Sequence, residues 1–349
     1  YINISDIHTA LHLTNKISFA ECKEDLNFDA VRIVNIFDSF TASSENTFFK
    51  TALISFFQKL ERLKIQVEFY FLPSTKFFDD IAEPIRSFLS ILSSNYENIC
   101  DAGFTFVINT IYLKSEKDAT AFSTSLKELL KENDINNLTV TSQRFATELY
   151  AYDSMHLVPQ ILSLILEHGS YSDYVNYREL FDIPSKNIDS SAAFSRNGLF
   201  GLSGEKKSIY HAWNMLSPLG DSIILNKEGI LVTKKGHDYH ILLFNPLGSN
   251  SMQESTRTAD IQFSLNFKTS YGYSYTLIEA SLDNEFSLFR KLSEFNFSEK
   301  LTPKDVKYLN MYTSPKISIS SFSPSESNIL NVGIKPYSAK LLILEKRET

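Results

Sequence analysis

The sequence predicts an α/β part followed by an all-β part. Over the first two thirds of the chain, short apolar runs alternate with amphipathic stretches, which is the pattern of strand–helix units. From Ser222 onward, short alternating strands are separated by loops rich in Ser, Asn and Gly, which is typical of an antiparallel sandwich. The pattern changes after Leu219-Gly220, so we expect domains at residues 1–219 and 220–349.

The expected strands of the first part are short apolar runs bounded by turn residues. They cover residues 2–4, 30–36, 66–72, 104–109, 138–141 and 173–177. The expected helices cover about 9–25, 46–64, 79–95, 118–133 and 154–168, and a last helix lies near 206–217. In the second of these, Phe49, Leu53 and Phe56 recur at three- and four-residue spacing, which gives the helix one apolar face.

The second part contains eight short runs in which apolar residues alternate or cluster. They cover residues 223–225, 230–233, 239–244, 261–267, 275–280, 316–320, 330–334 and 339–344. Strands this short, with polar loops between them, pack as two antiparallel sheets.

Composition excludes several classes of function. Gly is scarce (11 of 349 residues) and no Gly-rich phosphate-binding motif occurs, so no nucleotide cofactor is expected. The net charge of −7 is not clustered, which argues against direct DNA binding by this chain. Cys22 and Cys100 lack metal or redox spacing, and His237 and His240 lack a third ligand, so no metal is expected. No apolar run approaches membrane-spanning length.

Several motifs, in order, carry a family resemblance. They are Asn27–Asp38, Val67–Pro73, Gly198–Leu202, Lys206–Trp213, Tyr239–Asn245, Leu282–Glu285 and Leu301–Pro315. Together they resemble family 39 glycoside hydrolases, the β-xylosidase and α-L-iduronidase type. The chain is most similar to divergent copies fused behind an AraC/XylS-type helix-turn-helix domain in bacterial regulators. It begins at Tyr1 rather than Met, so we expect a fragment of a longer protein.

The resemblance implies a (β/α) TIM-type barrel followed by a β-sandwich. Only about 30 residues separate the runs at 104–109 and 138–141, too few for two intervening strand–helix units of ordinary length. The expected barrel is therefore degenerate and shortened.

The catalytic positions implied by the resemblance hold neutral residues. The general acid/base follows an Asn in the family, and here Thr110 follows Asn109; the nucleophile position matches Ser142. Retaining glycosidases need two carboxyl groups roughly 5–5.5 Å apart, and neither hydroxyl supplies one. We therefore expect a protein without catalytic activity. The alternative is an active glycosidase that uses rearranged carboxylates at Glu148 and Glu68.

Other polar residues on or after the expected strands are candidates for ligand binding. These are Arg32, Asn35, Glu68, Tyr70, Asn109 and Gln143. Arg32 lies on an apolar strand and cannot be buried unpaired, so it either contacts a ligand or pairs with Glu68 or another carboxylate. The amides of Asn35 and Asn109 suit sugar hydroxyls, but they equally suit turns at strand ends.

The expected function is an effector-binding or dimerisation domain of an AraC-family transcriptional regulator in the cytoplasm. Its partner would be a carbohydrate or another small effector, and a homodimer is one expectation. DNA would be contacted only through a domain outside this chain, and no membrane is involved. A purely architectural spacer is the remaining alternative, because a shortened barrel must cover its exposed strand edges.

Overall fold

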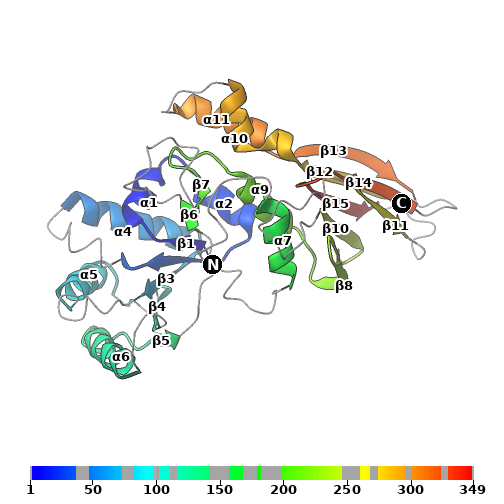
Figure 1. Ribbon diagram of the computed structural model, residues 1–349. Coiled ribbons are helices and arrows are strands. Elements are labelled where there is room, and N and C mark those ends of the chain that lie inside the picture. Colours follow the sequence, from blue (N-terminus) through cyan, green and yellow to red (C-terminus); the bar gives the residue numbers. More distant parts are fainter. Residues whose placement is uncertain are drawn as a thin grey trace. The chain divides into compact units, whose positions relative to one another are not determined.

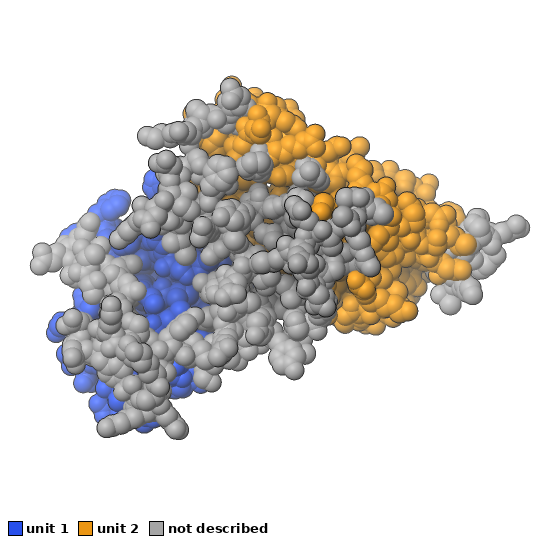
Figure 2. Space-filling model, viewed as in Figure 1, with its two compact units in different colours: residues 1–147, 176–183 blue, residues 148–175, 184–349 orange. Residues whose placement is uncertain are grey.

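The computed structural model describes residues 2–36, 47–72, 82–97, 99, 102–110, 116–141, 157–167, 179–181, 198–245, 260–267, 274–295, 301–323 and 329–347. The chain forms two compact units (Figure 2): unit 1 is Tyr1–Thr147 with Asn176–Ile183, and unit 2 is Glu148–Val175 with Pro184–Thr349. The expected boundary between residues 219 and 220 falls inside unit 2.

The described part of unit 1 contains a parallel sheet. Its strands are β1 (Ile2–Ile4), β2 (Ala30–Val34), β3 (Gln66–Phe71), β4 (Phe104–Asn109), β5 (Leu138–Thr141) and β6 (Glu179–Phe181). Within the unit they lie in the order β5-β4-β3-β2-β1-β6, and neighbouring strands pair in parallel. The first five strands confirm the prediction; β6 was not predicted, and the strand expected at 173–177 lies outside the described residues.

Helices connect these strands (Figure 1). They are α1 (Ile7–Leu13), α2 (Phe19–Leu26), α4 (Thr47–Arg62), α5 (Ala82–Asn95) and α6 (Glu116–Lys131). The single helix expected over residues 9–25 is two helices, because Ser18 begins a new one. Its hydroxyl accepts a hydrogen bond from the backbone N–H of Glu21, which satisfies one free donor of the first turn of α2.

One face of the unit 1 sheet packs against helices through aromatic side chains. Phe69 of β3 contacts Phe57 of α4 at 5.7 Å and Phe88 of α5 at 4.8 Å between ring centroids. Phe57 also contacts Phe104 of β4 at 5.5 Å. Because side chains alternate along a strand, the neighbours of Phe69 in β3 point to the opposite face of the sheet.

Unit 2 contains an antiparallel sandwich and several helices. The sandwich strands are β8 (Ser222–Lys227), β9 (Ile230–Lys235), β10 (Asp238–Phe244), β11 (Ile261–Asn266), β12 (Tyr275–Leu282), β13 (Lys316–Phe322), β14 (Ile329–Ile334) and β15 (Ala339–Lys346). The unit also contains the short strand β7 (Gly198–Phe200), which belongs to neither antiparallel sheet. The helical elements are α7 (Leu157–Glu167), α9 (Ser208–Leu216), η2 (Asn284–Phe286), α10 (Leu288–Phe295) and α11 (Pro303–Thr313). One sheet has the order β13-β12-β15-β10-β9-β8, and β11 pairs with β14 in the other, which confirms the predicted antiparallel pattern.

The central strands β10 and β15 of the six-stranded sheet are apolar on both faces. On one face Ile241 and Leu342 pack in a cluster with Val332 of β14. On the other face Leu242 and Leu341 lie in a second cluster that includes residues of α7 and α9. This double burial explains why β10 reads as a continuous apolar run rather than an alternating one. No described helix is long and apolar enough to span a membrane.

Candidate functional site

A row of polar residues crosses the face of the unit 1 sheet that lies opposite the aromatic helix contacts. The strand register places Asn3 beside Arg32 and Arg32 beside Glu68, and β6 places Glu179 beside Asn3. Partners in a parallel register share one face, so these four residues form what we call the polar row. Asn3, Glu68 and Glu179 are 0%, 7% and 2% exposed. Buried groups of this kind are stable only when they are hydrogen-bonded or paired.

Arg32 and Glu68 form an ion pair in this row. The Nε–H of Arg32 donates to Oε1 of Glu68, and the two side chains are 13% and 9% exposed. The guanidinium carbon of Arg32 also lies 4.4 Å from the centre of the Tyr70 ring. A carboxylate and an aromatic face therefore hold the cation together. This is the paired arrangement that the sequence left open for Arg32.

Tyr70 connects the ion pair to β4. The side-chain amide of Asn109 donates a 2.7 Å hydrogen bond to the Tyr70 hydroxyl, and both residues are buried. A continuous set of contacts thus runs from Glu68 through Arg32 and Tyr70 to Asn109, across three neighbouring strands. Four of the six ligand-binding candidates are brought together in this way.

Asn35 closes the turn after β2. Its Oδ1 accepts a 2.8 Å hydrogen bond from the backbone N–H of Leu72, and its own N–H donates to the Tyr70 carbonyl at 2.9 Å. Its φ of 49° lies in the left-handed region, which Asn tolerates better than most residues. The amide oxygen therefore has a structural task in joining the ends of β2 and β3.

Thr110 lies where the resemblance implies a general acid/base. Its backbone N–H and its hydroxyl both donate to the carbonyl of Thr141, at 2.8 and 3.2 Å. The register pairs Asn109 directly with Thr141, so no strand separates β4 from β5. The Thr110 hydroxyl secures the ends of two neighbouring strands and offers no acidic proton near neutral pH. Ser142, Gln143 and Glu148 lie outside the described residues.

Glu179 is a buried carboxylate that the sequence did not single out. Its Oε2 accepts a 2.9 Å hydrogen bond from the backbone N–H of Ser5, and its Oε1 accepts one from the Ser5 hydroxyl. Ser5 follows β1, so the carboxylate reaches toward the carboxyl end of that strand. One feature of the sequence could have indicated this residue. Glu179 is the first residue of the short run Glu179–Phe181, whose other two residues are apolar, and the run begins two residues after the strand expected at 173–177. The polar row therefore carries two carboxylates, Glu68 and Glu179.

No group of three His, Cys, Asp or Glu side chains within the described ranges could hold a metal ion. Of the pair His237 and His240, the latter is buried in β10, and this burial lowers its pKa below the usual histidine value.

Comparisons with known proteins connect this fold to sugar-cleaving enzymes. No family model and no curated protein matches the sequence. Among solved structures, the GH39 enzyme from Xanthomonas axonopodis pv. citri is 11% identical, with a TM-score of 0.66 over 99% of this chain and 93% of that one. A monomeric β-xylosidase from Caulobacter crescentus CB15 is 10% identical, with a TM-score of 0.67 over 99% and 95%. A GH30 endoxylanase from Clostridium papyrosolvens C71 gives a TM-score of 0.50 at 10% identity over 94% and 93%.

The fold therefore resembles that of the GH39 enzymes: a TIM-like α/β unit with a parallel sheet, accompanied by antiparallel sheets. The resemblance extends over nearly the whole chain.

One expectation has to be corrected. The sequence predicted a protein without enzymatic activity, but this expectation is contradicted by the solved structures that share the fold, which are a GH39 enzyme and β-xylosidases. The expectation was based on Thr110 and Ser142 alone. It did not count Glu179, and Ser142 lies outside the described residues.

The Arg32–Glu68 pair gives a first prediction. Arg32→Met leaves the Glu68 carboxylate buried without its partner, so the free energy of unfolding should fall by about 3 kcal/mol. Urea denaturation followed by circular dichroism measures this change. The double variant Arg32→Met/Glu68→Leu should recover most of the loss. Arg86→Met is the control, because its pair with Glu83 is 53% and 85% exposed and should cost less than about 1 kcal/mol. Equal losses for Arg32→Met and Arg86→Met would contradict a buried, mutually dependent pair.

Proposed function

We propose that the polar face of unit 1 binds a carbohydrate. The observation that carries this proposal is the network formed by Arg32, Glu68, Tyr70 and Asn109 on three adjacent strands. It offers a guanidinium, a carboxylate, a phenol and an amide in one place. Sugar hydroxyls both donate and accept hydrogen bonds, and a few convergent polar groups beside an aromatic ring suit them. The likeness to xylosidases and xylanases supports the same class of ligand.

We further propose that the chain hydrolyses glycosidic bonds. This chemistry needs one carboxyl group to protonate the leaving oxygen and a second to attack the sugar or activate water. Glu68 and Glu179 lie on the same face of the sheet and are the candidates among the described residues. Their strands are three positions apart, about 14 Å along the sheet at ~4.8 Å per strand. The proposal therefore requires the sheet to curve so that their side chains converge. Glu148 is the further candidate from the sequence.

Sugar binding is tested with a conservative change. Tyr70→Phe keeps the ring over Arg32 but removes the hydroxyl that accepts from Asn109. The buried amide then loses a partner, and affinity for xylobiose should fall about tenfold. Isothermal titration calorimetry measures the change. Tyr308→Phe is the control, since Tyr308 lies on α11 and is 45% exposed. Unchanged affinity in Tyr70→Phe would place the sugar elsewhere.

Hydrolysis is tested with 4-nitrophenyl β-xyloside. Glu68→Gln and Glu179→Gln should each lower kcat by about 10²–10⁴ while the fold is retained, because each removes one acid or base. Glu132→Gln, an exposed change that follows α6, should have no effect. If Glu148→Gln abolishes turnover while the other two variants retain it, the assignment moves to Glu148.

We also propose a regulatory setting for the domain. The motif order resembles the xylosidase-like part of AraC/XylS-type regulators, such as the repressor of surface proteins. In that setting the sugar would be the effector of a cytoplasmic protein, and homodimers would be the binding form. DNA would be contacted only by a separate helix-turn-helix domain. Such control requires the effector to bind one state better than the other.

The regulatory proposal predicts that sugar changes DNA binding by a protein in which this chain is joined to its helix-turn-helix domain. Xylobiose should change the DNA affinity of that protein about fivefold or more, measured by fluorescence anisotropy. Tyr70→Phe should shift the response to higher sugar concentration. DNA affinity that is the same with and without saturating sugar would refute the regulatory role, while leaving sugar binding intact.

A further inference from the structure

Unit 2 contains a polar cavity that is separate from the polar row of unit 1. It has a volume of about 350 Å³ and lies beside β12, β13, β15 and the end of β14. Its walls include the charged side chains of Glu279, Asp283, Glu285, Lys316, Lys335 and Lys340. The strand register explains this gathering, because Ser281 lies opposite both Lys316 and Lys340 in the neighbouring strands.

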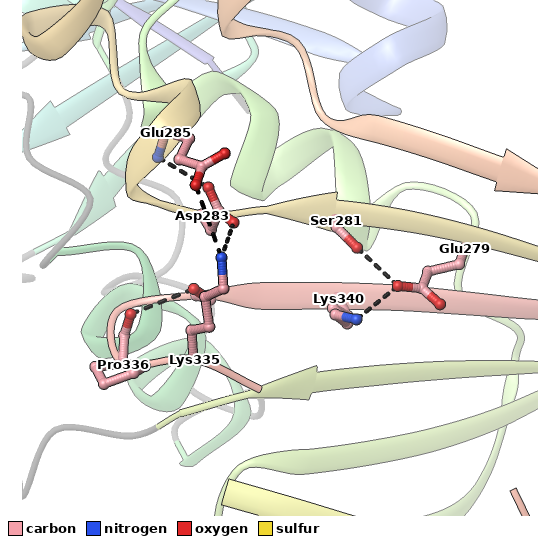
Figure 3. Close-up of polar contacts among 8 residues, drawn as sticks. Glu279, Ser281, Asp283, Glu285, Lys335, Pro336 and Lys340 are labelled. Carbon is pink, nitrogen blue, oxygen red and sulfur yellow. Dashed lines mark hydrogen bonds and ion pairs between the residues drawn. The ribbon is translucent and has the colours of Figure 1, made fainter. Parts of the chain in front are cut away.

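Ion pairs fix most of these charges in place (Figure 3). Oε1 of Glu279 accepts from Lys340 at 2.6 Å and from the Ser281 hydroxyl at 2.9 Å. Farther along the cavity, Lys335 lies 3.3 Å from Asp283 and 3.9 Å from Glu285. Figure 3 shows both of these carboxylates turned toward the Lys335 ammonium. Glu279 and Lys340, whose side chains are 28% and 24% exposed, are therefore positioned before any ligand arrives, which lowers the entropic cost of binding. Lys335 and Glu285 are 62% and 61% exposed and are held less firmly.

The electrostatics of the cavity identify the kind of ligand. Its walls carry three carboxylates and three ammonium groups, so their formal charges cancel. Burial alone would raise the pKa of Glu279, but hydrogen bonds from Lys340 and Ser281 outweigh it and hold the pKa below the usual range. Glu279 is therefore ionised at neutral pH. An anionic ligand would be repelled by the three carboxylates, and a cationic ligand would be repelled by the three lysine ammonium groups.

A neutral ligand with many hydroxyl groups avoids both repulsions. Its hydroxyls can donate to Glu279 and Asp283 and accept from Lys316. Phe286, which is partly exposed, adds an apolar surface on which the carbon face of a sugar ring can lie. The cavity volume is at the lower end of the range for small-molecule sites, which run from about 300 to 1,000 Å³.

We propose that this cavity binds a neutral mono- or disaccharide, independently of the polar row in unit 1. The site is built from Glu279, Ser281 and Lys340 on one side and Asp283 and Lys335 on the other. Lys316 lines the same cavity and forms no ion pair or hydrogen bond with any residue that the structure describes, so its ammonium group can donate to a ligand.

Selective labelling tests the proposal on the full chain. The sequence has 11 glycines, so ¹⁵N-glycine labelling gives at most 11 backbone amide signals. Gly333 lines the cavity, and its signal is assigned with Gly333→Ala. Titration with methyl β-D-xylopyranoside or xylobiose should shift the Gly333 signal. The signal of Gly236, in the turn between β9 and β10, should stay in place.

Matched variants identify the contacts and separate the two sites. Glu279→Gln should weaken the Gly333 titration about tenfold, because a charged acceptor is lost. Glu228→Gln, in the exposed turn before β9, should leave the titration unchanged. Glu68→Gln should also leave it unchanged, which distinguishes this site from that of unit 1. The proposal is overturned if neutral sugars leave Gly333 unmoved, or if sodium glucuronate shifts it at lower concentration than they do.

Discussion

The burial of charged side chains on one face of a parallel sheet is the constraint on which the candidate site depends. Glu68 has Phe69 as its neighbour in β3, and the packing of Phe69 on Phe57 and Phe88 leaves that strand only one acceptable orientation. A shift by one residue would press a carboxylate against the aromatic helix contacts and move a phenylalanine into the polar row. The aromatic packing on one face therefore positions the acid on the other. Arg32 must then be held opposite Glu68, and the register of β2 on β3 does this.

The elements of the fold were largely predictable wherever apolar residues recur at a clear period. The strands of unit 1 up to residue 141 and those of the sandwich follow this pattern, and the structure agrees. Neither α10 nor α11 was expected from the sequence. The helix α11 buries only Leu309 and Thr313, so its apolar face is weak. The better signal was local: Thr302 and Asp305 form a capping box with Pro303 in the first turn. Similarly, Ser18 marks a helix start inside a stretch that reads as one continuous helix.

The candidate site was only partly predictable, because its members are brought together by register and strand order. Arg32 and Glu68 could be paired from the sequence, since they lie at matching places in successive βα units. The place of Glu179 could not be predicted from the sequence. Glu179 lies beside Asn3 only because the chain returns from β5, at one edge of the unit 1 sheet, to the far side of β1. The strand β6 has only three residues, which is too short for a recognisable alternation of apolar and polar residues, so the sequence does not reveal this strand. The neutral character of Thr110 was visible, but its bonds to Thr141 were not.

These positions have a consequence for any reaction at this sheet. Thr110 is occupied in joining β4 to β5, so acid–base chemistry cannot be centred at the ends of those strands through this residue. The carboxylates of the polar row instead belong to β3 and β6, with β1 and β2 between them. A sugar that reached both acids would lie across β1 and β2, above Asn3 and Arg32. The same guanidinium that pairs with Glu68 would then lie beneath the sugar, so sugar affinity would depend on the Arg32–Glu68 ion pair.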